Sequence, residues 1–201
     1  MEETRKGMLL VVSGASGTGK GTLVKRLLED DLGFEFSVSA TTRAPREGEI
    51  DGVHYHFLTD ARYDELVEQD AFLEYAAFCG NRYGTLKKEV YARMERGRSV
   101  VLDIETQGAL NVMKKAPDCV SVFILPPSYA ELRRRLEARK TEPPDVIERR
   151  MQTARHEIEQ MDRYQYIVVN DNLDAAYAQL REIILAEKQR SNRYFPVVPE
   201  E

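Results

Sequence analysis

The stretch Met8-Leu-Leu-Val-Val12, followed directly by Ser13-Gly-Ala-Ser-Gly-Thr-Gly-Lys20, decides the fold class of this chain. A short, uninterrupted apolar run between glycines is typical of a strand that is buried on both faces of a parallel sheet. The residues from Gly14 to Lys20 match the pattern G-x-x-x-x-G-K, whose glycines let several backbone N–H groups point at one anion. A helix-compatible stretch, residues 22–30, follows and would add its positive N-terminus. We therefore predict a strand, a phosphate-binding loop and a helix, with Lys20 reaching the β- and γ-phosphates of a nucleotide.

The magnesium ligands of this loop depart from the usual pattern. Gly21 stands where Ser or Thr normally helps to hold Mg²⁺, and Thr22 comes one place later. Asp103 lies in the predicted strand 99–104, near the carboxyl end that faces the ligand crevice in a parallel sheet. Two interpretations of Asp103 stay open, an acidic partner for Mg²⁺ and an ordinary strand-end aspartate. The nucleotide site predicted here consists of Gly14, Ala15, Ser16, Gly17, Thr18, Gly19, Lys20, Gly21 and Thr22, with Thr22 and Asp103 as candidate metal ligands.

Outward from this loop, predicted strands alternate with predicted helices, which indicates a parallel α/β sheet. Two insertions interrupt the alternation, residues 34–84 and an arginine-rich region near 133–155. Residues 34–58 predict short strands and turns, and the proline-containing tail from Gln189 is predicted to fray. Further strands are predicted at residues 99–104, 120–125 and 166–169, and helices at 61–69, 86–95, 107–115, 128–139 and 173–186. A long helix is predicted after Pro143-Pro144, with an apolar face formed by Ile147, Met151, Ala154, Ile158 and Met161.

The composition excludes several classes of protein. The chain has 201 residues, of which 42% are hydrophobic and 31% charged, which is ordinary for one globular domain. Its longest apolar run, Met8 to Val12, is far shorter than the ~20 residues of a membrane-spanning helix. A net charge of −5 disfavours a protein that coats nucleic acid. The two cysteines, Cys79 and Cys119, favour a reducing, cytoplasmic setting.

A second anion site is indicated by the segment Ser39-Ala-Thr-Thr-Arg-Ala-Pro-Arg46. Its two arginines are three residues apart among hydroxyl residues, and guanidinium groups bind phosphate bidentately. Tyr55 and Tyr83 would add neutral donors. The arginines near residues 133–155 admit two interpretations, a solvated helix face or a clamp for a small polyanion. A signalling GTPase is disfavoured, because Asn170-Asp-Asn-Leu173 lacks the lysine of the base-reading motif Asn-Lys-x-Asp.

Six separated motifs follow one another in the order and spacing of the guanylate kinase family, which the chain resembles from about residue 7 to residue 186. The resemblance implies a P-loop NTPase fold, in which helices flank a five-stranded parallel sheet. It also implies a GMP-binding insertion with a small mixed sheet at about residues 34–98, and a mobile helical lid at about 131–155. The core would comprise residues 7–33, 99–130 and 160–186, and residues 187–201 would form a C-terminal tail. The motifs are Ser39-Ala-Thr-Thr-Arg-Ala-Pro-Arg46, Glu49-Ile-Asp-Gly-Val-His-Tyr55, Phe72-Leu-Glu-Tyr75, Gly80-Asn-Arg-Tyr-Gly-Thr85, Leu102-Asp-Ile-Glu-Thr-Gln-Gly108 and Ile167-Val-Val-Asn-Asp171.

The resemblance also implies roles for individual residues in phosphoryl transfer from ATP, bound with Mg²⁺, to GMP. Asn170 would lie near the adenine of ATP. Glu105, a candidate reader of guanine, stands where many members of the family have Asp. The GMP site would comprise Ser39, Arg43, Arg46, Tyr55, Glu74, Tyr83, Thr85, Asp103 and Glu105, and the catalytic residues would be Lys20, Arg43, Arg135, Arg139 and Arg150.

The predicted chemistry needs no general base. The phosphate of a nucleoside monophosphate is already anionic near pH 7, because its second pKa is about 6. Two alternatives remain, a catalytically silent guanylate-kinase-like module that binds proteins, and a kinase of another monophosphate. The retained Lys20 disfavours the first, and Glu74 disfavours the second, because a carboxylate accepts from the N1–H and 2-amino groups that only guanine has. We predict ATP and GMP as partners, with neither nucleic acid nor membrane; the sequence leaves open whether the chain is a monomer or a homo-oligomer.

Overall fold

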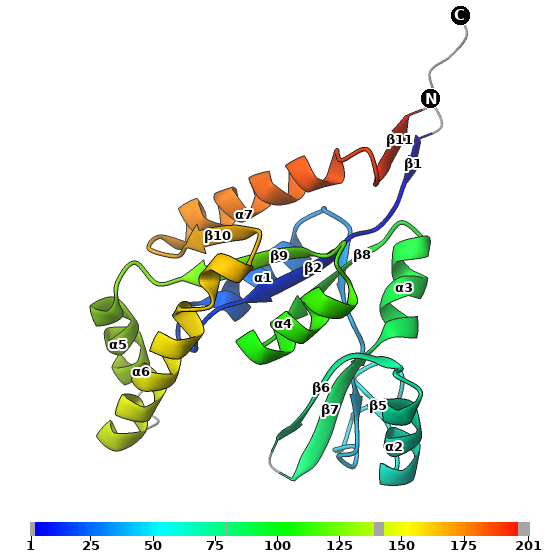
Figure 1. The fold of residues 1–201 in the computed structure, drawn as a ribbon, viewed down its shortest axis with the longest axis horizontal. Coiled ribbons are helices and arrows are strands. Elements are labelled where there is room, and N and C mark those ends of the chain that lie inside the picture. Colours follow the sequence, from blue (N-terminus) through cyan, green and yellow to red (C-terminus); the bar gives the residue numbers. More distant parts are fainter. Residues whose placement is uncertain (1–2, 79, 139–142, 197–201) are drawn as a thin grey trace, which may run out of the picture.

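A five-stranded parallel sheet lies at the centre of the molecule, with strands in the order β10-β9-β2-β8-β3 (Figure 1). The computed structural model describes residues 3–78, 80–138 and 143–196. This arrangement confirms the predicted α/β class and the five-stranded parallel sheet. The strands are β2 (Leu9–Ser13), β3 (Phe34–Phe36), β8 (Ser99–Asp103), β9 (Val120–Leu125) and β10 (Tyr166–Val169).

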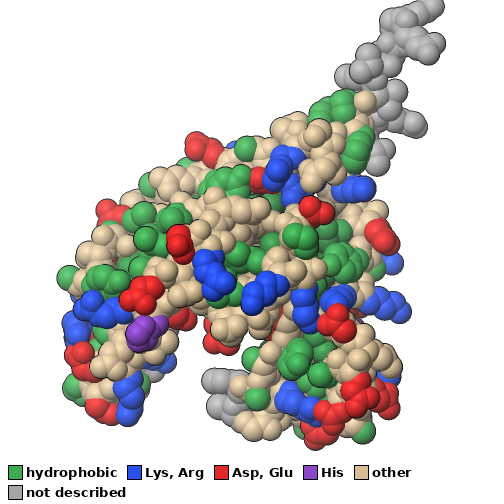
Figure 2. All heavy atoms as spheres, viewed as in Figure 1, with side chains coloured by type: hydrophobic (Ala, Val, Ile, Leu, Met, Phe, Trp, Pro, Cys, Tyr) green, Lys and Arg blue, Asp and Glu red, His purple; other side chains and the backbone are tan. Residues whose placement is uncertain are grey.

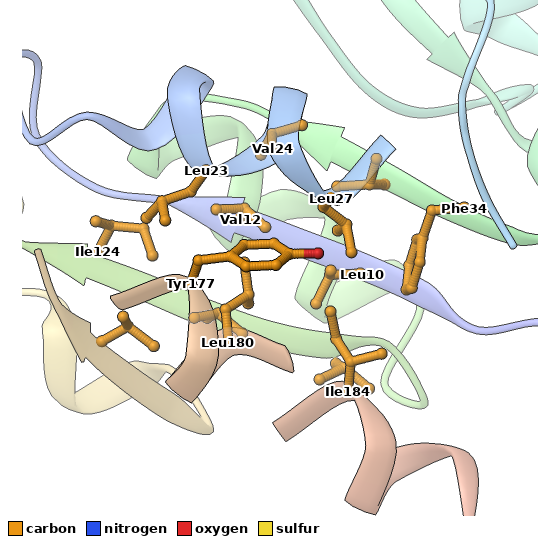
Figure 3. Close-up of a cluster of buried hydrophobic side chains, with 14 of the residues drawn as sticks. Leu10, Val12, Leu23, Val24, Leu27, Phe34, Ile124, Tyr177, Leu180 and Ile184 are labelled. Atoms are coloured by element: carbon orange, nitrogen blue, oxygen red, sulfur yellow. The ribbon is translucent and has the colours of Figure 1, made fainter. Parts of the chain in front are cut away.

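Both faces of the sheet are covered, which is why β2 is apolar at nearly every position. Leu10 and Val12 belong to a buried cluster between the sheet and two helices, α1 (Lys20–Glu29) and α7 (Leu173–Lys188) (Figure 3). Leu9 and Val11 belong to the cluster on the other face, where α3 (Lys87–Glu95) and α4 (Thr106–Lys115) pack. Alternate side chains of a strand point to opposite faces, so a strand covered on both sides has no polar face.

A second, mixed sheet contains β5 (His56–Phe57), β4 (Ala40–Thr41), β7 (Asn81–Leu86) and β6 (Phe72–Phe78), in that order. Helix α2 (Asp60–Glu68) is anchored on it by Tyr63, whose ring stacks on that of Phe72 with centroids 4.8 Å apart. The small mixed sheet was predicted, but its boundary at residue 34 was wrong. Strand β3 pairs with β8 in the central sheet, because the buried Phe34 belongs to the core cluster under α1, and the mixed sheet begins at Ala40.

Two helices project from the central sheet beside the phosphate loop (Figure 1). They are α5 (Tyr129–Ala138) and α6 (Pro144–Ile158), which is followed by the short helix η1 (Met161–Arg163). The predicted apolar face of α6 is confirmed at Ile147, Met151 and Ala154, which are buried against α5. The start of α5 has the sequence of a capping box, Ser128 with Glu131 three residues later, but only half of the box is formed. The Ser128 hydroxyl accepts from the backbone N–H of Glu131 over 3.1 Å, but the Glu131 carboxylate binds arginines instead.

The C-terminal segment differs from its prediction. Strand β11 (Tyr194–Pro196) pairs antiparallel with β1 (Glu3–Arg5), so the tail is ordered as a strand up to Pro196. The rest of the predicted tail, residues 197–201, lies outside the described residues. Glu187 and Arg193, which flank the turn before β11, are both buried and form an ion pair. Over the described ranges, no helix combines the length and the apolar character needed to cross a membrane.

Candidate active site

The loop between β2 and α1 has the backbone that its glycines predict. Gly14 and Gly19 have φ angles of +146° and +85°, which other residues rarely adopt. Neither position has room for a side chain. A Cβ on Gly14 would lie 2.4 Å from the carbonyl oxygen of Ile124, and one on Gly19 would lie 2.4 Å from Nδ2 of Asn170. Because α1 begins at Lys20, the loop leads directly into the positive end of a helix, as an anion site requires.

Asn170 supports this loop from the end of β10. Its side chain is buried, and Nδ2 donates to the carbonyl oxygen of Thr18 over 2.8 Å. The Thr18 hydroxyl in turn donates to the carbonyl oxygen of Ala15 over 2.9 Å. The contact observed for Asn170 is therefore with the backbone of the loop, whereas the resemblance assigned it to adenine; the adenine contact stays a prediction.

Lys20 and Asp103 meet at the mouth of the loop, where β8 ends. Lys20 Nζ lies 3.0 Å from Oδ1 of Asp103. A Cβ on Gly21 would lie 3.4 Å from Oδ2 of the same carboxylate, so glycine leaves that oxygen uncovered. Thr22 is exposed on the first turn of α1. In the part of the chain that is described, no group of three or more His, Cys, Asp or Glu side chains could hold a metal ion.

Two of the three arginines assigned to the lid fall within the described residues. Arg150 of α6 places Nη1 3.3 Å from the hydroxyl of Ser16 in the phosphate loop. Arg135 of α5 instead donates from Nε to Glu131 Oε1, 2.7 Å away and one helical turn back. Arg139 lies outside the described residues. The structure thus brings Arg150 to the loop, while Arg135 is held within its own helix.

The predicted second anion site is assembled at one end of the mixed sheet. The Arg43 guanidinium lies 5.4 Å from the centre of the Tyr55 ring, and the Tyr55 and Tyr83 rings are 6.1 Å apart. Arg46 belongs to the same cluster, because its backbone N–H donates to Glu49 Oε2 over 2.7 Å. The Arg43 guanidinium and two phenol rings from three separate segments therefore lie together, with the backbone of Arg46 beside them. Binding of phosphate by this cluster stays a prediction.

Glu49 organises this cluster, and sequence reasoning gave it no role. Arg43 Nη2 donates to Glu49 Oε1 over 2.8 Å. The Arg43 hydrogen bond and the Arg46 backbone N–H together lower the pKa of Glu49 to about 2. The same ion pair raises the pKa of Arg43. The signal that could have identified Glu49 is its spacing, three residues after Arg46 in a turn.

The resemblance assigns four residues to the base, Ser39, Glu74, Thr85 and Glu105. Of these, Glu74 and Thr85 are in direct contact. The Thr85 hydroxyl donates to Oε1 of Glu74 over 2.7 Å. Burial raises the pKa of Glu74, the Thr85 hydroxyl lowers it, and the nearby Glu105 carboxylate raises it further. Ser39 lies just before β4 in the same sheet, and its carbonyl accepts from the His56 backbone N–H over 2.9 Å. The result is a half-buried carboxylate that forms no ion pair with a cation of the described residues.

The register of the mixed sheet places the base and phosphate candidates side by side. Tyr83 and Thr85 are two residues apart on β7, so their side chains share one face of the sheet. Glu74 pairs with Thr85, and Ala76 pairs with Tyr83. Figure 2 shows a hollow between the lobe formed by α5 and α6 and the lobe of the mixed sheet. This arrangement suits a nucleoside monophosphate, whose base and phosphate would lie along one face of β7.

Comparison with known proteins agrees with this geometry. The family model described as Guanylate kinase matches residues 6–187. Guanylate kinase of Desulfitobacterium hafniense is 47% identical over 191 residues, which cover 95% of this chain and 96% of that protein. Guanylate kinase of Neisseria gonorrhoeae is 48% identical, with coverage of 96% and 94%. The crystal structure of guanylate kinase from Anaplasma phagocytophilum matches 96% of this chain and 92% of its own, with 32% identity and a TM-score of 0.70.

Proposed function

The chain belongs to the guanylate kinase family, and from this premise we propose that it transfers the γ-phosphoryl group of ATP to GMP, giving ADP and GDP. One observation supports this activity above the others. The same fold carries a glycine-rich loop ending in Lys20 and, on the separate mixed sheet, a cluster of Arg43, Tyr55 and Tyr83 near the half-buried carboxylate of Glu74. This cluster supports a second phosphate site. A protein that only hydrolyses ATP needs no second phosphate site.

The reaction is a direct transfer between two anions. The attacking oxygen belongs to the GMP phosphate, which carries its charge already and needs no base to remove a proton. The protein's task is to bring two repelling phosphates together and neutralise them. We assign Lys20 and Arg150 to the ATP phosphates and Arg43, Arg46, Tyr55 and Tyr83 to the GMP phosphate, with Arg135 and Arg139 as further lid cations.

Guanine selection follows from the Glu74 carboxylate. Its two oxygens match the N1–H and 2-amino donors of guanine, and adenine offers neither. Thr85 occupies one lone pair of Oε1 and thereby fixes the orientation of the carboxylate. Ser39 and Glu105 are assigned supporting positions at the base. Glu105 is exposed, and its charge repels that of Glu74, which donors from guanine would relieve.

The donor set at the mouth of the loop suits Mg²⁺ that arrives with ATP. Mg²⁺ prefers oxygen ligands, keeps several waters and commonly takes only one or two carboxylates from the protein. The uncovered Oδ2 of Asp103 and the hydroxyl of Thr22 are the candidates to hold it or its waters. When bound, the ion would supply charge neutralisation to the phosphates. Asp103 is therefore assigned to the metal and to Lys20, in addition to its predicted place in the GMP site.

Lid helices α5 and α6 would exclude water from the reacting phosphates, since water is the competing acceptor. We expect the reaction to take place in the cytoplasm. Cys119 is buried, and burial raises the pKa of its thiol to about 11, which leaves it unreactive and in keeping with a reducing compartment.

A coupled assay of ADP formation tests the proposal. Purified protein with ATP and Mg²⁺ is given GMP, AMP, UMP or CMP in turn, and ADP formation is expected to depend on GMP. No turnover with any acceptor would favour the silent protein-binding module. Equal turnover with AMP would contradict the assignment of Glu74.

A further inference from the structure

Helix α6 packs directly against the phosphate loop. Ala15 of the loop and Ala154 of α6 belong to one buried cluster. Arg150, one turn before Ala154, contacts the Ser16 hydroxyl. Glu157 follows Arg150 by seven residues, or about two helical turns, so it shares this face of the helix. The face therefore presents one cation and one carboxylate to the loop.

The Glu157 carboxylate has neighbours on three other segments of the chain. Burial raises the pKa of Glu157, the Lys20 ammonium lowers it, and the Glu105 carboxylate raises it. The Ser16 backbone N–H and the Thr106 hydroxyl are close enough to lower it as well. Together with Glu105 and Thr106, Glu157 lines a cavity of about 450 Å³. One side chain of α6 thus lies between the phosphate loop and the segment that carries the guanine candidate Glu105.

Thr106 offers an unused hydrogen-bonding group at this point. Thr106 is 6% exposed, and its hydroxyl oxygen lies near both the Glu157 carboxylate and the Tyr164 hydroxyl. In the described ranges it forms no hydrogen bond of normal geometry with either of them. A buried hydroxyl without a partner costs roughly 1–3 kcal/mol. A small shift of the neighbouring Glu157 carboxylate would supply that partner. Because Thr106 is the first residue of α4 and follows Glu105, the contact would also fix the position of Glu105.

We propose that Glu157 is a positioning residue that ties α6 to the phosphate loop through the Ser16 N–H and to the start of α4 through the Thr106 hydroxyl. The inference rests on the proposed function, because it concerns the alignment of Lys20 and Glu105 for the same reaction. Arg150 and Glu157 lie on the same face of α6. Glu157 therefore keeps the phosphate loop and the segment that contains Glu105 aligned with Arg150. Removing this link misaligns the groups without removing any direct contact to substrate.

A double-mutant cycle tests the link. Glu157→Gln keeps the shape of the side chain but removes its charge, Thr106→Val removes only the hydroxyl, and both are combined in one double variant. Each single variant is expected to lower kcat/KM for GMP roughly 10-fold, mostly through kcat, and the double variant no further than about 20-fold. Thr106→Ser, which keeps the hydroxyl, is expected to stay within about threefold of wild type.

Glu159→Gln is the matched control, because Glu159 lies at the end of the same helix and its side chain is 67% exposed. It is expected to remain within about twofold of wild type. The inference is overturned if Glu157→Gln, folded by its circular dichroism spectrum, matches wild type, or if the two single effects multiply to about 100-fold. Failure of the proposed function is a separate result, since then wild type itself would form no ADP with GMP.

Discussion

At the scale of single residues, the charged groups of the site are held in place by partners within the chain. Lys20 is paired with Asp103, and Arg43 with Glu49. These pairs fix the direction of each cation, so less reorganisation is needed when phosphate arrives. The carboxylates of Asp103 and Glu49 therefore orient the cations. Replacing a cation tests how far the reaction depends on its charge.

Lys20→Ala is expected to lower kcat by about 10³-fold or more, because the charge that stabilises the transferring phosphates is lost. Its fold is expected to remain, since Lys20 is no part of the buried core. The measurement is steady-state kinetics together with circular dichroism. Lys25→Ala, at an exposed position on the same helix, is the control. Near-normal turnover of a folded Lys20→Ala variant would rule out the role assigned to this lysine.

Glu74→Gln is expected to lower kcat/KM for GMP by roughly 10²- to 10⁴-fold. The new NH₂ group would face a donor of guanine, which leaves two donors unpaired in a buried site. The KM for ATP and the activity on AMP should change little, because neither depends on this carboxylate. The ratio of kcat/KM for GMP to that for AMP is the measurement. A ratio that stays within about threefold of wild type would show that another residue reads guanine.

The same Glu74 makes GMP binding and stability depend on pH. Its pKa is raised, mainly by burial, and a protonated carboxyl cannot accept from both guanine donors. The KM for GMP should therefore rise as the pH falls through this raised pKa.

A carboxyl whose pKa is raised on folding destabilises the fold above that pKa, and the penalty fades as the pH falls. Glu74→Gln should raise Tm at pH 7, and a gain of 1 kcal/mol would appear as about 2–4 °C. An unchanged or lower Tm would contradict this balance.

At the scale of elements, α5 presents two arginines that share one carboxylate. Arg134 and Arg135 both donate to Glu131, and their hydrogen bonds lower its pKa to about 2. Arg134 is 69% exposed and Arg135 22%, so only Arg135 is partly enclosed. The two positions therefore allow a solvated arginine, Arg134, to be compared with Arg135, the arginine proposed to act in catalysis.

Arg135→Ala is expected to reduce kcat by about 10-fold or more with little change in the KM for GMP, because a lid cation acts mainly in the closed complex. Arg134→Ala removes the same charge from the same helix and should stay within about twofold of wild type. Both values come from initial rates at varied GMP and saturating ATP. Equal effects of the two variants would assign both arginines to a solvated face.

Elements with strong local patterns were predictable from the sequence, and the hairpin β6–β7 was not. The central strands are apolar because both faces are buried, so they stand out from their surroundings. In β6, the register shifts between Phe72 and Glu74, and Tyr75 is exposed, so neither alternation nor a continuous apolar run marks the strand. The same limit applies to the site. Motifs identified Lys20 and Arg43, but the placement of Glu157 near the loop depends on how α6 packs, which no local pattern records.

At the scale of the whole molecule, the C-terminal segment is fastened by a buried ion pair. Arg193 Nη1 binds the Glu187 carboxylate, Nη2 donates to the carbonyl oxygen of Asp118 over 2.7 Å, and the Tyr166 hydroxyl donates to Glu187. Burial raises the pKa of Glu187, but the hydrogen bonds from Tyr166 and Arg193 outweigh it and lower the pKa overall. The network is therefore charged at neutral pH, and its stabilising effect is lost as the pH falls through the lowered pKa.

Arg193→Met is expected to destabilise the protein by about 3 kcal/mol, because it leaves a buried carboxylate without its main partner. In a chain of this length, that corresponds to a fall in Tm of roughly 6–12 °C. Arg190→Met is the control, since Arg190 is 55% exposed and contacts the same carboxylate at 3.4 Å. Differential scanning calorimetry measures both. A shift of less than about 2 °C for Arg193→Met would mean that the pair contributes little.

The pairing of β1 with β11 has a consequence for engineering. Glu3 lies opposite Pro196, so the two strands leave the molecule from neighbouring points, about one strand spacing (~5 Å) apart. A domain whose first and last strands end close together can be inserted whole into a surface loop of another protein without stretching that loop. Such a graft would sit on the host by its β1–β11 ribbon, well away from the phosphate loop. The nucleotide binding proposed for the domain would then be available as a signal to which the host responds.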